Sequence, residues 1–188
     1  TVHEATDIRR DVIRRALRGG YPEVMGRRRA DRRAAWFRSY TTTILQRDVR
    51  ELTQISQPQD VTRLLAIVAA RVGSTLNVLD VSRALSLPHM TVRRYLTVLE
   101  RLFFIHQIPG WSGGLNARVT QHPKAYLPDS GLLGHLIGVD VARFEKDPTL
   151  AGALIENFVV GELERQRGWN ASAVTLYHFR TTTNEVDS

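Results

Sequence analysis

The sequence predicts a mainly α-helical protein with a smaller α/β part. Three observations support this fold class. The 188 residues include 43% hydrophobic and 24% charged side chains, the composition of an ordinary globular protein. Apolar residues recur at helical spacing before residue 103, and runs rich in β-branched and aromatic residues follow that point. We expect a helical lead-in over 1–72, a helix and strand unit over 73–110, and a mixed segment over 111–188.

The lead-in is expected to contain three helices. The first spans residues 7–18, and "RGGYPEV" ends it because two glycines and a proline cannot continue a helix. The second is a long amphipathic helix over 31–54, and the third runs from Val61 to a stop at Gly73. The apolar residues expected to face the core are Ile8, Val12, Ile13, Leu17, Phe37, Tyr40, Ile44, Leu45, Val49, Leu52, Val61, Leu64, Leu65, Val68 and Val72.

Residues 77–108 have the pattern of two helices followed by a strand. A short helix begins at the capping pair Asn77 and Asp80, and "SLP" then turns the chain. A second helix begins at His89 and leads into the β-rich run "FFIHQIP", which "GWSGG" ends. The apolar positions of the two helices are Leu79, Val81, Ala84, Leu85, Val92, Leu96, Leu99 and Leu102. Helix, turn, helix and strand in this order are typical of a winged helix-turn-helix, which we therefore predict over 73–110.

The segment after residue 110 combines strands and helices. "KAYL" predicts a short strand, after which Asp129 or Ser130 caps a helix that ends at Gly138. A further helix is expected from Ala153 to Gly168. The residues that this helix directs toward the core are Leu154, Phe158 and Leu163. "AVTLYHFR" and "TTTNEVDS" predict two strands joined by a turn.

Positive charge is concentrated at the start of the chain. Residues 1–50 contain 13 arginines against six acidic residues, so the net charge of +7 for the whole chain lies in this part. A basic stripe is expected on a surface that binds phosphate groups, although solvated helix faces carry such runs more often. The candidate nucleic-acid-binding residues of this region are Arg27, Arg28, Arg29, Arg32 and Arg33.

A second candidate set for nucleic-acid binding lies on the second helix of the predicted winged helix. Its members are His89, Thr91, Arg93 and Arg94. The net charge of residues 74–108 is only +2, and winged helices also serve as packing modules, so both DNA contact and packing are expected alternatives. We expect any DNA binding to be weak, salt-sensitive and indifferent to sequence, with the arginines of residues 27–29 contributing more than Arg93 and Arg94.

Features that the sequence lacks narrow the protein class. It has no cysteine, no apolar run long enough to span a bilayer and no secretory signal, so we expect no disulfide, no membrane partner and a cytoplasmic location. The six histidines are scattered, and no nucleophilic triad is recognisable, so neither a zinc site nor a serine hydrolase is expected. A start without Met indicates either the interior of a longer product or an artificially chosen boundary.

Six blocks of sequence occur in an order that carries a resemblance. They are "GGYPEV" (19–24), "YTTTILQRDVREL" (40–52), "LNVLDVSRAL" and "TVRRYLTVLERLFFI" (within 76–105), "PKAYLPDSGLLGHLIG" (123–138), "GALIENFVVGEL" (152–163) and "YHFRTTTNEVD" (177–187). Together they resemble the C-terminal region of a widespread bacterial and archaeal family of AAA-type P-loop ATPases whose cellular role is unassigned. At the helix-turn-helix, Ser86 and Pro88 stand where that family commonly has a Gly and a Ser or Thr.

The resemblance implies an N-terminal ATPase domain in the full-length protein. That missing domain is the expected partner of this chain, and ATP and Mg²⁺ are the expected cofactors of the full-length protein. No "GxxxxGK[ST]" motif occurs in the 188 residues, so no cofactor is expected for this fragment by itself.

The resemblance also implies that residues 111–188 form a truncated half similar to restriction-endonuclease-like PD-(D/E)xK folds. That pattern requires an acid on the first helix, an acid on the second strand and a (D/E)xK strand. Glu156 and Asp187 match the first two, with Glu185 beside them, and the third is absent because the chain ends at Ser188. These residues are the implied catalytic set, and Glu156 and Asp187 are the implied Mg²⁺ ligands.

Two functions are therefore expected from the sequence. The first is a non-catalytic module that binds nucleic acid or another protein part and serves an attached ATPase. The alternative is a metal-dependent nuclease, toxin-like or related to defence, that requires residues beyond the present C-terminus to complete its site.

Overall fold

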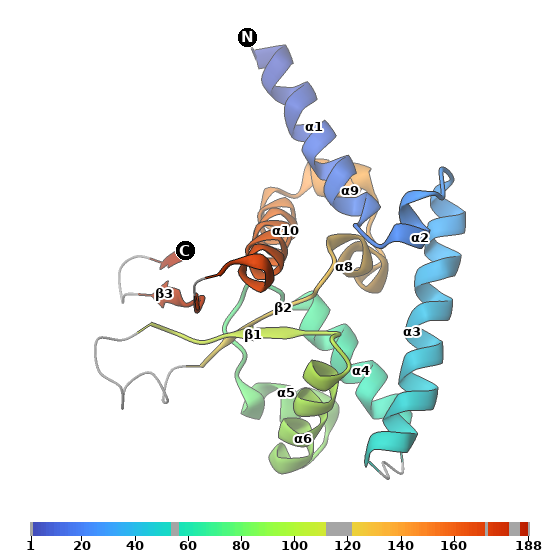
Figure 1. Ribbon diagram of the computed structural model, residues 1–188, viewed down its shortest axis with the longest axis vertical. Coiled ribbons are helices and arrows are strands. Elements are labelled where there is room, and N and C mark those ends of the chain that lie inside the picture. Colours follow the sequence, from blue (N-terminus) through green and yellow to red (C-terminus); the bar gives the residue numbers. More distant parts are fainter. Residues whose placement is uncertain (1, 54–56, 112–121, 172, 181–184, 188) are drawn as a thin grey trace.

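Helices dominate the protein, and its strands form two short antiparallel pairs (Figure 1). The structure, a computed structural model, describes residues 2–53, 57–111, 122–171, 173–180 and 185–187. The predicted fold class, mainly α with a smaller part that contains strands, is confirmed. No helix within the described ranges combines the length and the apolar composition that crossing a membrane requires.

The lead-in consists of four helices. They are α1 (Val2–Arg18), α2 (Pro22–Met25), α3 (Ala30–Thr53) and α4 (Pro58–Ala70). The predicted end of the first helix is confirmed, because Gly19 follows α1 with φ +77°. The short helix α2 was not predicted. Phe37 and Leu45 of α3 are buried as expected, and Val49 and Leu52 lie outside the residues whose side chains are described.

The buried face of α1 differs from the predicted one. Ile13 and Ala16 are buried and Leu17 packs against the core, but Ile8 is 65% exposed and Val12 is 39% exposed. Only a narrow stripe of α1, formed by residues three and four positions apart, packs against helices from the end of the chain. Ile8 and Val12 lie outside this stripe. The prediction that Ile8 and Val12 face the core is therefore wrong.

Helices α4, α5 (Val78–Leu85) and α6 (His89–Arg101) pack against one another. The side chain of Asn77 accepts a hydrogen bond from Leu79 N at 2.9 Å, which confirms the predicted N-cap. Asp80 does not complete a capping box, because its carboxylate pairs with Arg83 at 3.1 Å. Leu79 is exposed, contrary to prediction.

The turn between α5 and α6 begins at Ser86, whose φ is +56°. Glycine is favoured in this left-handed conformation. Ser86 adopts it at the position where the AAA-type family that the sequence resembles commonly has Gly. Ala84 of α5 is exposed, which corrects its predicted place in the core. The inward face of the pair is formed by Val81, Leu85, Val92, Tyr95, Leu96, Val98 and Leu99.

The first strand pair is β1 (His106–Ile108) with β2 (Lys124–Tyr126). The strands are antiparallel, with His106 opposite Tyr126 and Ile108 opposite Lys124. Thr75, between α4 and α5, forms an antiparallel bridge to Lys124 on the other edge of β2. All three residues of β2 are buried, so this strand lies inside the molecule.

The second strand pair is β3 (His178–Arg180) with β4 (Glu185–Asp187). It is antiparallel, and His178 lies opposite Asp187. A parallel bridge between Gly110 and His178 joins it to the end of β1. The predicted hairpin is confirmed, although β3 begins at His178 and is shorter than the predicted strand over 173–180.

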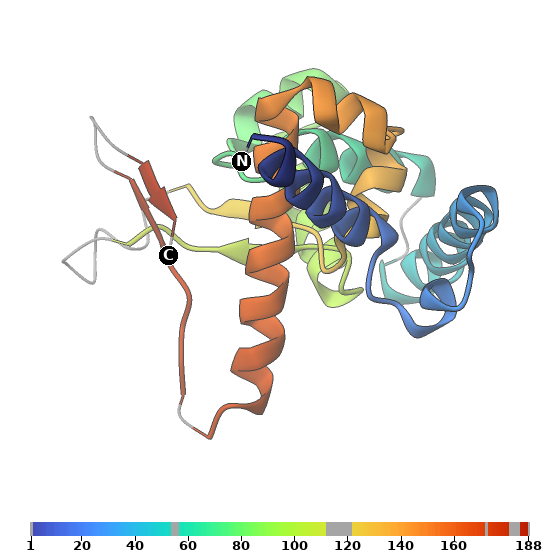
Figure 2. The same ribbon diagram turned by 90° about the horizontal axis from the view of Figure 1, so that it is seen from above.

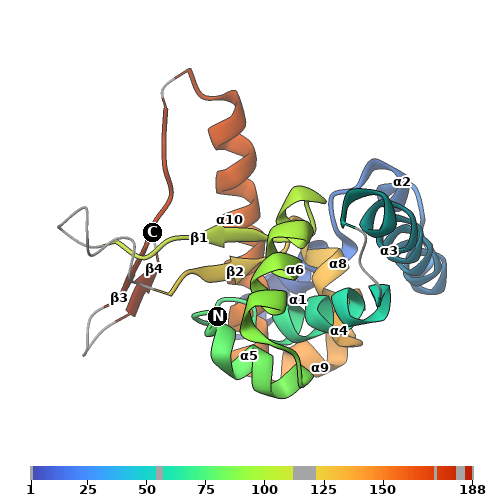
Figure 3. The ribbon, with the colours of Figure 1, turned by 90° about the horizontal axis from the view of Figure 1, so that it is seen from below.

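Within the described residues, the remaining helices are α8 (Ser130–Ile137), α9 (Val141–Lys146) and α10 (Pro148–Trp169). Asp129 caps α8, and Gly138 ends it with φ +66°, as predicted. Helix α10 begins five residues before the predicted start because Asp147 provides an N-cap for Leu150 N. Leu163 is 36% exposed, so its predicted place in the core is wrong. Figures 2 and 3 show the end of α10 extending beyond the helical body.

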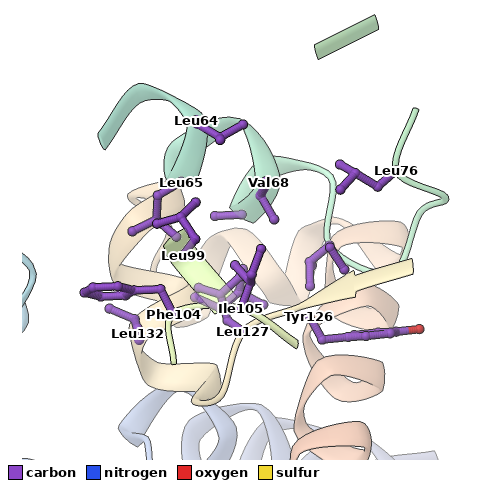
Figure 4. Packing of buried hydrophobic residues seen from close by; sticks show 14 of the residues in the cluster. Leu64, Leu65, Val68, Leu76, Leu99, Phe104, Ile105, Tyr126, Leu127 and Leu132 are labelled. Carbon is purple, nitrogen blue, oxygen red and sulfur yellow. The ribbon is translucent and has the colours of Figure 1, made fainter. Parts of the chain in front are cut away.

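One hydrophobic core connects the segments. Figure 4 shows Leu64, Leu65 and Val68 of α4 above the residues that lead into β1 and follow β2. Its other labelled members are Leu76, Leu99, Phe104, Ile105, Tyr126, Leu127 and Leu132. Buried residues from the ranges 1–72, 73–110 and 111–188 belong to this one cluster, and it holds α6, β2 and α10 in fixed relative positions.

Candidate functional site

The outward face of α6 is polar and basic. His89, Arg93 and Arg94 are exposed, and Thr91 is half-buried near the beginning of the helix. Thr97 and Arg101 continue the exposed face toward the end of the helix. Because the opposite face of α6 is buried in the core, these side chains are presented on a rigid support.

The arginine run before α3 is partly committed to contacts within the chain. Arg29 forms two hydrogen bonds with Asp31, at 3.0 and 2.9 Å, and this interaction lowers the pKa of the Asp31 carboxyl. Arg33 donates to the carbonyl oxygens of Arg27 and Arg28, at 3.1 and 2.8 Å. These contacts hold the loop between α2 and α3, so the run has a structural role. Arg28 and Arg32 are exposed.

The two predicted nucleic-acid-binding sets do not form one surface. Figure 1 shows α2 and the beginning of α3 at the upper right, and α6 at the lower centre. The middle of α3 approaches the chain just after α6, where the ring centroids of Tyr40 and Phe104 lie 5.8 Å apart. The structure therefore brings His89, Arg93 and Arg94 together and leaves the arginines of residues 27–33 elsewhere.

Glu156 lies on α10 above the buried strand β2. Its Oε1 accepts a hydrogen bond from the Tyr126 hydroxyl at 2.5 Å and lies 3.4 Å from Lys124 Nζ. The side chain of Lys124 is 1% exposed and that of Glu156 is 26% exposed. A Cβ atom added to Gly73 would lie 2.9 Å from Glu156 Oε1, so this glycine leaves room for the carboxylate. The cluster neutralises a buried ammonium group.

A pocket of about 200 Å³ lies beside this cluster. It is lined by Ile108, Tyr126, Glu156, Val159, Val160, Leu163, Leu176, Tyr177 and His178. His178 is buried, and its Nε2 lies 3.1 Å from the carbonyl oxygen of His122. Its Nδ1 is also buried and has no hydrogen-bond partner in the described part of the chain. The pocket therefore combines an apolar wall with polar groups.

The predicted carboxylates are brought toward this pocket to different extents. Glu156 lines it directly. Asp187 is opposite His178 in the register of β3 and β4, and Glu185 is opposite Arg180. The side chains of Asp187 and Glu185 lie outside the described part of the structure. Among the residues whose side chains are described, no group of three His, Cys, Asp or Glu could hold a metal ion.

Three residues that sequence reasoning missed organise the same region. Lys124 and Tyr126 are two apart on β2 and therefore share one face, a spacing visible in "KAY". Asn157 is 1% exposed, accepts from Leu127 N at 2.8 Å and donates to Leu127 O at 3.2 Å. It fastens α10 to the end of β2. No local signal distinguishes Asn157 from a surface residue, because its partner is 30 positions away.

Asp129 has a second role beside helix capping. Its Oδ1 accepts from Leu132 N at 2.8 Å, and its Oδ2 accepts from Gly20 N at 2.6 Å. The "GGYPEV" and "PDSGLLG" blocks therefore meet at one carboxylate. Burial raises the pKa of Asp129, and the backbone hydrogen bonds from Gly20 and Leu132 oppose this shift.

Comparison with known proteins places the chain in a family. Residues 9–143 match the family described as "Domain of unknown function (DUF8612)", and the chain belongs to it. Similar proteins include an uncharacterized protein of Mycobacterium bovis and one of Mycobacterium tuberculosis. Each is 32% identical over 166 residues, and the match covers 88% of this chain and 36% of the relative. The chain thus spans about a third of their length. No solved structure matches the chain significantly.

Proposed function

We propose that this chain is a nucleic-acid-binding module that contacts double-stranded DNA through α6. The observation that carries the proposal is the exposed basic face of this helix. Arg93, Arg94 and Arg101 lie on it, while the opposite face is locked into the core. DNA-binding helices need basic and polar side chains on a rigid element, with phosphate contacts around them.

The arrangement around α6 supports a winged helix-turn-helix. Helix α4, the bridge residue Thr75, helices α5 and α6, and strands β1 and β2 follow the order expected of that fold. The bridge from Thr75 to Lys124 extends the pair of β1 and β2 by a third segment. In such a fold the second helix of the helix-turn-helix enters the major groove, and here that helix is α6.

The geometry favours Arg93 and Arg94 over the earlier arginines, which reverses the ranking expected from charge alone. Arg29 is paired with Asp31, and Arg33 donates hydrogen bonds to two carbonyl oxygens of the loop before α3. An arginine that already donates to an intramolecular acceptor must lose that bond to contact a phosphate. Arg93 and Arg94 are exposed, and the Arg94 guanidinium lies 5.5 Å from the centroid of the Tyr95 ring, a contact that uses none of its hydrogen-bond donors.

A fluorescent DNA duplex about two helical turns long tests this proposal by anisotropy. Replacing Arg93 and Arg94 with Ala is expected to weaken binding about tenfold, because two phosphate or base contacts are lost. The matched control replaces Arg28 and Arg32, which removes the same charge from the other end of the molecule. Equal losses for the two pairs would contradict the proposal. If the variant loses affinity for only one DNA sequence, Arg93 and Arg94 contact bases as well as phosphates.

A metal-dependent nuclease is the second candidate, and one observation favours it. Glu156 lines the pocket that also contains His178, and the backbone of Asp187 is paired with His178. The described residues do not by themselves fit Mg²⁺, because the Glu156 oxygen already faces a buried ammonium group and a tyrosine hydroxyl. Cleavage of DNA by a longer form of the protein, abolished by Asp187→Ala, would support the nuclease. Binding without cleavage would support the module.

We further propose that the whole protein is a cytoplasmic AAA-type ATPase and that its ATPase domain is the partner of this chain. The order of the six sequence blocks supports the proposal, and ATP and Mg²⁺ would be cofactors of that domain. The test is ATP hydrolysis by the full-length protein with and without DNA. We expect DNA to stimulate ATP hydrolysis by the wild-type protein. We expect no such stimulation in the Arg93→Ala and Arg94→Ala variants. A full-length protein without ATPase activity would overturn this part.

A further inference from the structure

A groove of about 430 Å³ lies away from α6, between the beginning of α3 and the helices α8 and α9. Its lining residues are Leu17, Ala30, Asp31, Arg33, Ala34, Phe37, Gly131, Gly134, His135, Gly138, Val139, Asp140 and Val141. All of them belong to the described part of the chain. Most are apolar or lack a side chain beyond Cβ, so the floor of the groove is apolar.

The groove exists because α3 and α8 face each other through small residues. Ala30 and Ala34 form the α3 wall, and Gly138 opens the far end, where an added Cβ would meet no atom within 4 Å. Phe37 and His135 form the base, with ring centroids 5.7 Å apart. Burial and the nearby Arg38 lower the pKa of His135, so the base is uncharged near neutral pH.

The α3 side of the groove is strongly basic. Residues 27–38 contain six arginines and one acidic residue, Asp31, which is paired with Arg29. Of these residues, Arg33 and Asp31 line the groove, Arg29 pairs with Asp31, and the charge of Arg38 acts on His135 at the base. On the other side Asp140 is used as the N-cap of α9, where it accepts from Arg143 N at 2.9 Å. An occupant of the groove therefore meets an apolar floor and a positive rim.

We propose that this groove docks an acidic peptide segment that inserts an apolar side chain between α3 and α8. Charge complementarity with the arginine rim selects the acidic character, and the apolar floor requires the inserted side chain. DNA is the weaker occupant because phosphates and sugars gain nothing from an apolar floor. The proposal is independent of DNA binding by α6, which lies across the molecule (Figure 1).

Selection from a phage library of random dodecapeptides tests the proposal with the folded chain as bait. Enriched peptides are expected to combine at least one Leu, Ile, Met or Phe with flanking Asp and Glu. The groove-blocked variant Ala34→Trp is used for counter-selection, and Ala30→Trp is a second blocking variant in case the first fails to fold. Binding of an enriched, fluorescent peptide is then measured by anisotropy.

Three comparisons decide the outcome. Ala34→Trp is expected to weaken peptide binding at least about tenfold while leaving DNA binding unchanged. Arg28→Glu with Arg32→Glu is expected to weaken it similarly. Arg71→Glu with Arg101→Glu, at two exposed sites outside the groove lining, changes the charge equally and is the matched control. No enrichment, enriched peptides without acids, or binding equal in the blocked variants would overturn the proposal.

Two alternative occupants are outcomes of the same experiment. If Ala34→Trp weakens the binding of a DNA duplex, the groove binds nucleic acid, and the proposal of an acidic peptide is overturned. Sedimentation of the chain alone tests for a second copy. A dimer that Ala34→Trp dissociates would show that the groove is filled by another molecule of this chain, which also overturns the proposal.

Discussion

The Glu156 carboxylate lies against a lysine that has almost no contact with solvent. The side chain of Lys124 is 1% exposed, and its ammonium group is 3.4 Å from Glu156 Oε1. A buried charge deprived of a partner is costly, whereas two apolar side chains of similar volume can replace a buried pair without loss. Glu156 is therefore expected to contribute to stability whatever else it does.

We predict that Glu156→Ala lowers the free energy of unfolding by about 3 kcal/mol in urea denaturation, because Lys124 remains buried without its carboxylate. The triple variant Lys124→Met, Tyr126→Phe and Glu156→Leu is expected to recover most of this loss, because it also removes the hydroxyl that donates to Glu156. The control is Glu162→Ala, which removes an exposed partner of Arg165 and should change stability by less than about 1 kcal/mol. A Glu156→Ala variant as stable as the control would show that the ion pair has no structural role.

Asp129 makes stability depend on pH. Burial raises its pKa in the folded state above the unfolded value, so the folded protein holds the proton to higher pH. The contribution of this group is fully present below the unfolded pKa and is lost as pH rises through the folded pKa. Asp129→Asn lacks this titration, so we predict that the stability difference between wild type and variant shrinks as the pH rises through the raised pKa of Asp129. Unfolding curves at several pH values measure it, and a growing difference would contradict the assigned direction.

Helix α8 approaches α1 closely because of its glycines. A Cβ atom at Gly131 would lie 2.8 Å from the Gly19 backbone, where nothing can move aside easily. We predict that Gly131→Ala destabilises the protein by about 1–3 kcal/mol through overpacking. Gly152→Ala on α10 is the control, since its Cβ would meet no atom within 4 Å and helix propensity should add about 0.5–1 kcal/mol. Thermal unfolding compares them, and similar effects at both sites would contradict the close approach.

The turn that follows α6 contains a residue with unfavourable backbone geometry. Phe103 has φ +56° and is 70% exposed, and Phe104 N donates to Leu99 O at 2.9 Å as in a Schellman motif. We predict that Phe103→Gly stabilises the protein by about 1 kcal/mol, because the left-handed conformation is free of strain for Gly and little buried surface is lost. Phe103→Ala keeps the strain and is the control. Destabilisation by Phe103→Gly would show that the aromatic ring packs usefully.

Elements with local signals were predictable, and those defined by distant contacts were not. The cap of α5 at Asn77 and the two ends of α8 depend on residues that are close in the sequence, so the sequence predicts them. Helices α2 and α9 are too short to show periodicity. The exposure of Val12 depends on which helices α1 meets, and the partners of Glu156 lie 30 and 32 positions away. The resemblance alone proposed Glu156 as a site residue, and no signal in the sequence predicted its contacts with Lys124 and Tyr126.

The distribution of charge over the whole molecule predicts how the proposed DNA binding would respond to salt. The net charge of +7 favours phosphate groups in general, and the proposed contacts of α6 would add attraction at defined positions. Each phosphate contact contributes about 0.9 to the slope of log affinity against log salt concentration. We predict that replacing Arg93 and Arg94 with Ala lowers this slope by about 2, whereas replacing Arg28 and Arg32 leaves it nearly unchanged. Anisotropy titrations at several salt concentrations provide the slopes, and the reverse result would assign binding to the start of α3.

The contact between α1 and α8 has a consequence for how the protein is made. Ser130 Oγ donates to Ala16 O at 2.6 Å across 114 positions of sequence, and α1 also packs against α9 and α10. A ribosome releases α1 long before these partners leave the exit tunnel. During that interval the apolar stripe with Ile13 and Ala16 has no native surface to cover it. Closing so long a loop is also entropically costly, so α1 docks late. We therefore expect the nascent chain to expose this apolar stripe until α10 has emerged.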